Sequence, residues 1–296
     1  MKYSIIGSNG FLATALTEFC NNQKFSVDLY GLEQPKGVKF NNFYEVNLTN
    51  EDIDYKLICE SDVIIYAAGA GIQSNLKEIP DLIYQLNVSV PIHICNRLKQ
   101  LDYKGVFITF GSVFELGKSD KDNMTTEKEI LSSTFKASND YTISKRLLTR
   151  FIADYQPEFI HWHFFIPTIY GEHENPFRLI PYTINAIKSK QKLNFTSGDQ
   201  VRQYVYINDV TEIIYKALQV KLPTGLYNIA SSEIYTVKEI VTLIHGAFGL
   251  EVPDDCFGTA QRTDAGLKYL ALNGKKLEQI IQFKPLTKLV DIIGKY

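Results

Sequence analysis

The 296-residue sequence predicts an α/β fold in which a doubly wound parallel sheet is followed by a smaller mixed α/β lobe. Three observations lead to this prediction. Apolar, strand-like segments alternate with segments of helical periodicity over residues 1–170. The run Val63-Ile-Ile-Tyr-Ala is apolar throughout, as expected for a strand buried on both faces. A glycine-containing turn also joins the first apolar segment directly to a helical pattern.

The elements expected in this first domain, residues 1–170, follow the alternation in order. Strands are expected at residues 2–7, 25–30, 62–67, 105–110 and 159–166. Helices are expected at residues 11–23, 50–60, 81–101 and 137–155. For the lobe of residues 171–296 we expect helices at 178–189, 209–219 and 236–248, a strand and turn at 193–207, and helical segments on both sides of Pro285.

The turn after the first strand has the chemistry of a dinucleotide-binding site of the Rossmann type. Gly7 permits a tight turn, Gly10 has no side chain to keep a pyrophosphate from the backbone, and Ala13 lets helix and sheet approach closely. The N-terminus of the following helix offers free N–H groups to phosphates. The cofactor-binding residues predicted at this turn are Gly7, Asn9, Gly10, Phe11 and Leu12.

A second motif, Tyr141-Thr-Ile-Ser-Lys145, is suited to proton transfer. The lysine lies one helical turn after the tyrosine, so both side chains share a helix face. A nearby ammonium is expected to lower the tyrosine pKa from its ordinary value of about 10. The hydroxyl of Ser112 could hold a substrate oxygen beside Tyr141. The sequence therefore predicts Ser112, Tyr141 and Lys145 as catalytic residues.

With these two motifs the chain resembles the extended short-chain dehydrogenase/reductases, in the NAD-dependent epimerase/dehydratase family of nucleotide-sugar enzymes. Further segments match in order, including Ser112 with Gly117, Ile166–Gly171, and Gly198–Asp209. The resemblance implies a Rossmann domain, a chain that crosses between the two lobes, and a homodimer formed through two helices. It also extends the predicted cofactor site to Ala67, Ala68, Gly69, Asn87, Tyr141, Lys145 and Ile166.

The end of the second strand bears on the choice of cofactor. Gly31 stands where NAD-binding relatives usually carry an aspartate for the ribose 2′-hydroxyl. Lys36 and Lys39 follow and could attract a 2′-phosphate. We therefore expect NADPH, with Gly31 in the cofactor site. The alternative is NAD, with Glu33 reaching back to the ribose.

The residues after Ser112 argue against one of the reactions known in this family, the elimination of water by a dehydratase. Dehydratases of the family usually place Asp-Glu there, whereas this chain has Val113 and Phe114, which cannot act as acid or base. The resemblance then implies NADPH-dependent reduction of a nucleotide-diphosphate 4-keto-6-deoxy sugar, as in surface-polysaccharide (O-antigen) synthesis. An NAD-dependent nucleotide-sugar 4-epimerase and a catalytically silent dinucleotide-binding sensor or scaffold remain as alternatives. The substrate-binding residues expected are Ser112, Arg178, Arg202 and Arg262, of which Arg202 matches the family arginine that pairs with a diphosphate.

Composition excludes some classes of partner. The net charge of −2 gives no electrostatic basis for binding nucleic acid or a membrane surface. The four cysteines are scattered and are interpreted as buried thiols in a reducing compartment, so the expected location is the cytoplasm. His161 and His163 share a strand face, but no third ligand lies nearby in the sequence, so no metal is expected.

Overall fold

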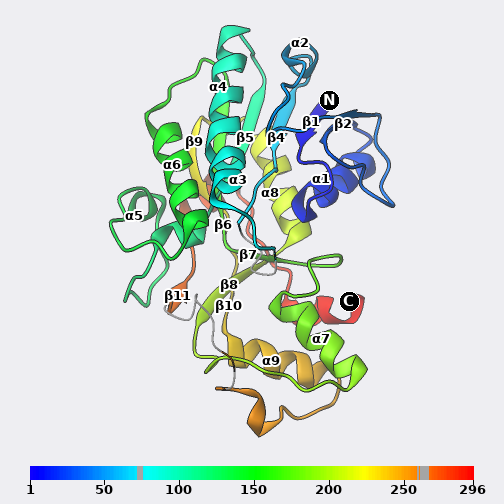
Figure 1. The fold of residues 1–296 in the computed structure, drawn as a ribbon, viewed down its shortest axis with the longest axis vertical. Coiled ribbons are helices and arrows are strands. Elements are labelled where there is room, and N and C mark those ends of the chain that lie inside the picture. Colours follow the sequence, from blue (N-terminus) through cyan, green and yellow to red (C-terminus); the bar gives the residue numbers. More distant parts are fainter. Residues whose placement is uncertain (72–75, 259, 261–266) are drawn as a thin grey trace.

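The computed structural model describes residues 1–71, 76–258, 260 and 267–296, which form two sheets with their helices. The larger sheet has seven parallel strands in the order β3-β2-β1-β4-β5-β6-β9. The smaller sheet has the order β10-β8-β11, with β7 also pairing with β8. Figure 1 shows the larger sheet and its helices in the upper part of the molecule and β8, β10, α7 and α9 in the lower part.

The strands of the larger sheet are β1 (Lys2–Ile6), β2 (Ser26–Gly31), β3 (Asn42–Glu45), β4 (Val63–Tyr66), β5 (Val106–Ser112), β6 (Ile160–Ile166) and β9 (Gly225–Asn228). Those of the smaller sheet are β7 (Thr168–Tyr170), β8 (Val201–Tyr206), β10 (Glu233–Thr236) and β11 (Tyr269–Leu270). Because the strands of the larger sheet are parallel, the ends of β1, β4, β5 and β6 meet at one edge, where ligands bind in open α/β sheets.

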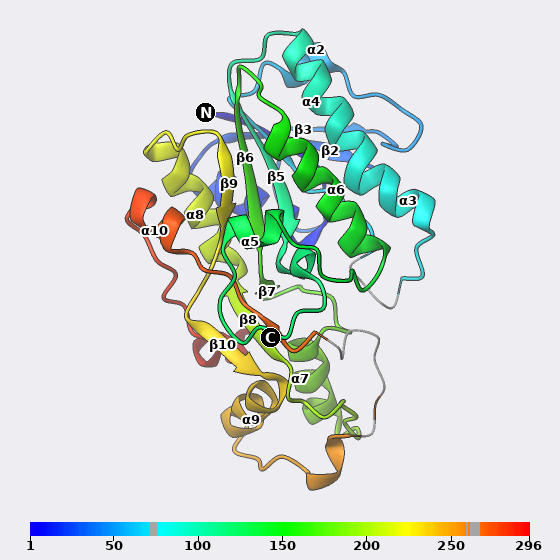
Figure 2. The same cartoon turned by 90° about the vertical axis from the view of Figure 1, so that its left-hand side faces the viewer.

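Helices cover both faces of the larger sheet, as Figures 1 and 2 show. One face carries α3 (Pro80–Tyr84), α4 (Val90–Gln100) and α6 (Asp140–Asp154), and the other carries α1 (Phe11–Asn22) and α8 (Ile207–Gln219). The remaining helices are α2 (Tyr55–Ile58), α5 (Glu127–Leu131), α7 (Leu179–Ser189), α9 (Val237–Ala247), α10 (Lys275–Ile281) and α11 (Leu289–Ile292).

Two apolar clusters lie on opposite faces of the larger sheet. Ile5, Ile65 and Ile108 pack with α1 and α8, while the adjacent residues Ile64 and Phe107 pack with α4. This alternation of buried side chains to both faces is why the central strands read as continuous apolar runs. The doubly wound sheet predicted from the sequence is thereby confirmed.

The structure corrects several predicted elements. The helix expected at residues 50–60 is only Tyr55–Ile58, because Asp54 caps it and the preceding residues form a turn in which Glu51 accepts a hydrogen bond from Asn47. The helix expected at 81–101 is interrupted by a π-helical turn, Gln85–Ser89. The edge strands β3 and β9 were not predicted, because both are short and neither has a fully apolar pattern.

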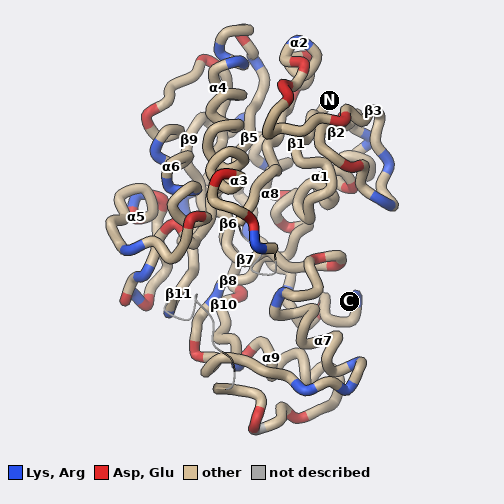
Figure 3. Tube along the Cα trace, viewed as in Figure 1, with Lys and Arg blue, Asp and Glu red and all other residues tan. Residues whose placement is uncertain are grey.

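The chain passes between the two sheets more than once. β9 and α8 follow β7 and β8 in sequence, yet β9 pairs with β6 of the larger sheet and α8 packs against α1. Lys and Arg are interspersed with Asp and Glu along the whole trace in Figure 3. Among the residues that the structure describes, none of the helices has the length and apolar character needed to cross a membrane.

Candidate active site

The turn between β1 and α1 has the shape that a pyrophosphate requires. Gly7 has a positive φ of 97°, and a Cβ added there would lie 2.5 Å from the backbone nitrogen of Ala68. At Gly10, the N-cap of α1, the nearest atom to an added Cβ is the Gly7 carbonyl oxygen at 3.6 Å, and no side chain caps the helix. The open helix N-terminus and the space above it fit the diphosphate of a dinucleotide.

The other residues predicted at this turn differ in whether their side chains are buried or line a cavity. Leu12 packs into the core, so its backbone rather than its side chain faces the open N-terminus. Asn9 and Phe11 line a cavity of about 630 Å³, which continues along the loop after β2 at Glu33 and Lys36. This cavity places the end of the second strand next to the glycine turn, as a bound ribose would need.

Gly31 has a steric role in the structure. A Cβ on Gly31 would lie 2.4 Å from the Ser8 hydroxyl oxygen, and that hydroxyl donates a hydrogen bond of 2.6 Å to the carbonyl oxygen of Glu33. The Glu33 carboxylate accepts a hydrogen bond of 3.5 Å from the Asn9 amide. The absence of a carboxylate at residue 31 is therefore explained by packing against Ser8, and Glu33 lies beside the glycine turn.

Asn87 fixes the loop that follows β4. Its amide exchanges two hydrogen bonds with the backbone of Ala70, at 3.0 and 2.8 Å, and also donates to the Ser144 hydroxyl at 3.0 Å. A Cβ on Gly69 would lie 3.1 Å from the Asn87 side-chain oxygen. Asn87 sits in the π-helical turn, a distortion that often marks functional positions. Asn87 therefore ties the backbone of Ala70 to Ser144 of α6.

Ser112, Tyr141 and Lys145 converge at the edge of the larger sheet. Ser112 ends β5 and pairs in register with Ile166, the last residue of β6. Tyr141 and Lys145 lie one turn apart on α6, and the Lys145 Nζ is 5.9 Å from the centroid of the Tyr141 ring. The Lys145 Nζ donates a hydrogen bond of 2.8 Å to the carbonyl oxygen of Phe110. The structure thus brings the three predicted catalytic residues and Ile166 together.

The electrostatics of Tyr141 differ from the sequence-based expectation. Burial raises the pKa of Tyr141 to about 12, and the negative charge of Glu115 acts in the same direction. A hydrogen bond with Ser112 and the positive charge of Arg178 lower the pKa of Tyr141. The sequence-based expectation assigned this effect to Lys145, but the Lys145 ammonium donates to the carbonyl oxygen of Phe110 instead. Burial also lowers the pKa of Lys145 to about 8, opposed by the charge of Glu115. Tyr141 is therefore a protonated phenol at neutral pH.

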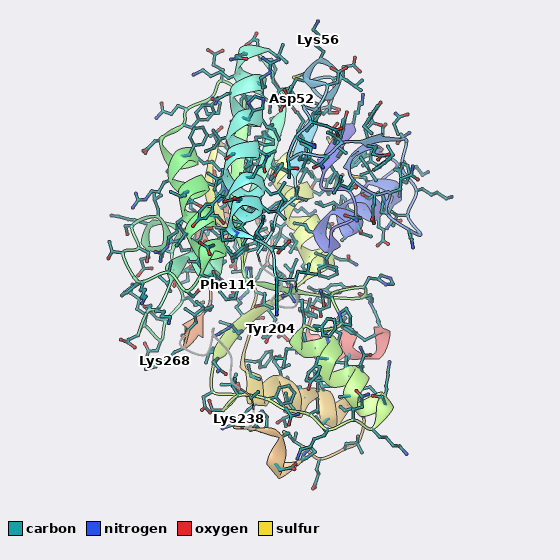
Figure 4. The ribbon with its side chains drawn as sticks, viewed as in Figure 1. Asp52, Lys56, Phe114, Tyr204, Lys238 and Lys268 are labelled. Atoms are coloured by element: carbon teal, nitrogen blue, oxygen red, sulfur yellow. The ribbon has the colours of Figure 1, made fainter. Side chains whose placement is uncertain are left out.

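Phe114 borders the reacting groups. Its ring meets the Tyr141 ring edge to face, with centroids 6.5 Å apart. Figure 4 places Phe114 where the larger domain meets the smaller lobe, above Tyr204 of β8. Val113 is buried. Neither residue brings an acid or base to the candidate site.

Glu115 was not predicted, although the sequence contains its signal. Ser112-Val-Phe-Glu115 has the spacing of a capping box, and the structure forms one over the 3₁₀ turn Val113–Leu116. The Glu115 Oε1 atom accepts a hydrogen bond of 2.8 Å from the Ser112 backbone N–H, and the Glu115 Oε2 atom accepts one of 2.6 Å from the Thr149 hydroxyl. The Glu115 carboxylate is fully buried.

Two of the three arginines expected to bind substrate, Arg178 and Arg202, lie in the smaller lobe or its connections. Arg178 precedes α7, pairs with Glu174 at 3.3 Å, and its charge acts on Tyr141. Arg202 on β8 is mostly buried, and its Nη1 donates to the backbone carbonyls of Val201 and Leu267, both at 2.8 Å. Arg262 lies outside the described residues. The positive charge of Arg178 therefore acts on Tyr141, one of the predicted catalytic residues.

His161 and His163 are buried hydrogen-bonding residues of β6. Both imidazoles contact the Thr109 hydroxyl, His161 at 3.0 Å and His163 at 2.8 Å, and His163 also contacts Thr149 at 3.0 Å. Burial holds the pKa of each imidazole well below its ordinary value. Over the described ranges, no group of three or more His, Cys, Asp and Glu side chains is arranged to hold a metal ion.

Curated proteins with related sequences act on nucleotide sugars. The chain is 26% identical over 254 residues to CDP-abequose synthase of Yersinia pseudotuberculosis, a match that covers 83% of this chain and 84% of that protein. It is 24% identical over 272 residues to UDP-glucose 4-epimerase of Neisseria gonorrhoeae, covering 83% of this chain and 78% of that protein. The two relatives carry out different reactions, so the similarity supports a nucleotide-sugar enzyme rather than one reaction.

A solved structure shows the same fold over almost the whole chain. UDP-glucose 4-epimerase of Thermus thermophilus, determined in complex with NAD, superposes with a TM-score of 0.82 at 17% identity and covers 99% of this chain and 96% of that chain. The model of the NAD-dependent epimerase/dehydratase family matches residues 3–230. This match spans the glycine turn, Ser112, Tyr141 and Lys145 and extends to β9. The chain therefore belongs to the NAD-dependent epimerase/dehydratase family.

Proposed function

We propose that the protein reduces the 4-keto group of a nucleotide-diphosphate 4-keto-6-deoxy sugar, with NADPH as the hydride donor. The observation that carries this proposal is the meeting of Ser112, Tyr141 and Lys145 at one edge of the larger sheet, with no acid or base at Val113 and Phe114. Reduction of a ketone requires a proton donor, whereas oxidation of a sugar hydroxyl requires a base. A pKa of about 12 for Tyr141 favours the donor role.

The residues of the site divide the reaction between them. A nicotinamide cofactor held at the glycine turn would supply the hydride for the carbonyl carbon. Ser112 donates a hydrogen bond to the carbonyl oxygen and orients it. Tyr141 transfers its proton to the same oxygen as negative charge develops there. Lys145 would hold the ribose hydroxyls of that cofactor.

Two features support a reductase rather than a dehydratase. Val113 and Phe114 occupy the positions directly after Ser112, and the one carboxylate in the segment, that of Glu115, is bound to Ser112 N–H and Thr149. Elimination of water needs an acid or base beside the sugar, which these residues do not supply. The similarity to CDP-abequose synthase also fits a deoxysugar pathway, such as one for O-antigen, and makes CDP-linked ketosugars the first substrates to supply.

The cofactor preference depends on Glu33 and Lys36. Since packing against Ser8 accounts for Gly31, the support for NADPH comes from Lys36, which lines the cavity beside the glycine turn. Glu33 lines the same cavity and would repel a 2′-phosphate while binding the ribose hydroxyls of NAD. The balance of the two charges sets the preference.

The second candidate function is an NAD-dependent nucleotide-sugar 4-epimerase. The position of Glu33 against Asn9 favours it, because a 4-epimerase keeps NAD and uses it in both directions. The similarity to UDP-glucose 4-epimerase agrees with this candidate. A silent sensor or scaffold fits less well, since Ser112, Tyr141 and Lys145 meet at one edge of the sheet.

We propose that the active protein is a homodimer that pairs through α4 and α6. Ile143 and Leu147 on α6 and Leu101 at the end of α4 are exposed, with relative accessibilities of 40%, 48% and 36%. A four-helix contact with a second copy would cover exposed apolar side chains on both helices.

The test is the absorbance at 340 nm of NADPH or NADH incubated with purified protein and a series of nucleotide-linked 4-keto-6-deoxy sugars. We expect stoichiometric loss of absorbance with one of them. Interconversion of nucleotide sugars that carry no keto group, with no net loss of absorbance, would establish the epimerase instead.

A further inference from the structure

Glu115 is a charged side chain with no exposure to solvent, directly behind the serine of the candidate active site. It is 0% exposed, and its two oxygen atoms bind the Ser112 backbone N–H and the Thr149 hydroxyl. Burial of a carboxylate is costly unless hydrogen bonds and an opposite charge compensate it. The groups around Glu115 should therefore show what compensates the burial of its charge.

Helix capping alone does not require the burial of Glu115. The same capping box occurs at Thr126 with Glu129 and at Thr236 with Glu239. Glu239 is exposed and Glu129 is partly exposed, yet both carboxylates accept the N-cap hydrogen bond. The capping geometry is thus available to a solvated glutamate, and the buried one has an additional role.

A chain of hydrogen bonds extends behind the Glu115 carboxylate. Thr149 contacts His163 Nε2 at 3.0 Å, His163 Nδ1 contacts Thr109 at 2.8 Å, and Thr109 contacts His161 Nε2 at 3.0 Å. The His161 Nδ1 atom is buried and has no hydrogen-bond partner within the described part of the chain. The chain therefore ends at one ring nitrogen, whose protonation depends on the direction of every bond in the chain.

The direction of this chain favours an ionised Glu115. If Thr149 donates to the carboxylate, each donor in the chain points toward Glu115, and His161 Nδ1 carries only a lone pair. If Glu115 were protonated and donated to Thr149, and the Thr149 hydroxyl turned to donate to His163, every bond would reverse, and His161 Nδ1–H would become a buried donor with no acceptor among the described residues. A buried unpaired donor costs about 1–3 kcal/mol. The chain thus opposes the rise in pKa that burial imposes on Glu115.

The charges that face Glu115 come mainly from α6. Lys145 and Arg146 both lower the pKa of Glu115, and Glu115 in turn raises the pKa of the buried Lys145. Arg146 is held by the carbonyl oxygens of Glu115 and Leu116, at 2.6 and 2.9 Å. The charge of Glu115 raises the pKa of Tyr141, which lies on the same helix. Burial lowers the pKa of His163 on β6, so that imidazole is neutral. Lys145 is the cation among these groups that belongs to the candidate catalytic set.

We propose that Glu115 is a positioning residue that keeps the buried Lys145 in its ammonium form and holds Ser112 at the end of β5, while the chain from Thr149 to His161 keeps Glu115 ionised. This inference rests on the proposed function, because it assumes that Ser112 and Lys145 serve cofactor and substrate. It assigns to one carboxylate both the placement of the serine and the charge of the lysine.

The test uses Glu115→Gln, which keeps the shape and removes the charge, with Glu239→Gln as the matched loss of an exposed capping carboxylate. NADPH affinity and the kcat/KM of ketosugar reduction are measured from pH 5.5 to 9.5. In Glu115→Gln we expect the alkaline limb of both profiles to move down by about one pH unit, because Lys145 loses its proton earlier. Glu239→Gln should keep the wild-type limb.

A second variant, Thr149→Val, removes the hydroxyl that donates to Glu115. We expect the acid limb to move up by about one pH unit, since the carboxylate then forms only at higher pH. Opposite movements of the two limbs would support the inference. Unchanged limbs in both variants, with only a lower melting temperature, would overturn it and leave Glu115 a structural residue.

The binding profile separates this inference from the proposed function. If the wild-type protein reduced none of the ketosugars while its NADPH affinity still showed the shift dependent on Glu115, the reductase assignment would fail and the role of Glu115 would stand. If reduction occurred with the same pH profile in wild type and Glu115→Gln, the role of Glu115 would fail and the reductase would stand.

Discussion

The two sides of the candidate active site are built in different ways. On the larger domain, Ser112 ends a strand and Tyr141 and Lys145 share one helix face, so regular elements fix their positions. On the smaller lobe, Arg178 lies before a helix, and Arg202 is held by carbonyl oxygens of neighbouring segments. Local spacing thus places Tyr141 beside Lys145, whereas tertiary contacts place the two arginines that we propose for substrate binding. Mutations on the two sides should therefore change different quantities.

The largest effect is expected at Tyr141. Tyr141→Phe removes the proton donor and retains the ring that packs against Phe114, so kcat should fall by about 10²–10⁴-fold. NADPH affinity should stay near the wild-type value in a binding titration. Turnover at the wild-type rate would show that another group donates the proton.

Arg178 tests the other side of the comparison. Arg178→Gln removes a charge that faces the site, and we expect the KM for the nucleotide sugar to rise about 10–100-fold, with a smaller change in kcat. Lys190→Gln, at the exposed far end of α7, is the matched loss of a positive charge and should leave KM unchanged. An equal response of the two variants would remove Arg178 from the substrate site.

Two glycines extend the comparison to stability. Gly7→Ala places a Cβ 2.5 Å from the Ala68 nitrogen at a φ of 97°, so the free energy of unfolding should fall by about 2 kcal/mol or more. Gly246→Ala in α9 meets no atom within 4 Å and should raise it by about 0.5–1 kcal/mol. Urea unfolding of both variants measures the difference. Equal destabilisation would contradict the strained turn that defines the cofactor site.

The smallest effect concerns cofactor choice. Glu33→Gln removes a carboxylate from the cavity beside the glycine turn, and the preference for NADPH over NADH should rise about tenfold. Lys36→Gln should shift the preference in the opposite direction. The ratio of the two kcat/KM values in each variant is the measurement, and a ratio that neither variant changes would place the 2′-position of the ribose elsewhere.

The sequence predicts the larger domain well because its signals are local. Strand β4 and the glycine turn each carry their own pattern, and the helical spacing of Tyr141 and Lys145 predicts their shared face without tertiary information. Glu115 could also have been found from the Ser-x-x-Glu spacing. Its burial could not, because that depends on the packing of α6 against β5 and β6.

Other features depend on contacts between distant segments. The short strand β11 exists through its pairing with β8, and the position of Glu33 against Asn9 depends on the packing of two loops. The steric reason for Gly31 is the hydroxyl of Ser8, which no spacing rule reveals. Because of these contacts, Gly31 no longer supports the preference for NADPH expected from the sequence, and the preference depends on Glu33 and Lys36 instead.

The most direct test of the reductase assignment follows the hydride itself. Purified protein is incubated with NADPH deuterated at the transferable position of nicotinamide C4. The second reactant is the ketosugar whose addition lowers the NADPH absorbance at 340 nm, and the product is analysed by NMR. The account predicts one deuterium at the former carbonyl carbon for each NADPH oxidised. A sugar with inverted configuration, no deuterium and no net oxidation of the cofactor would contradict it.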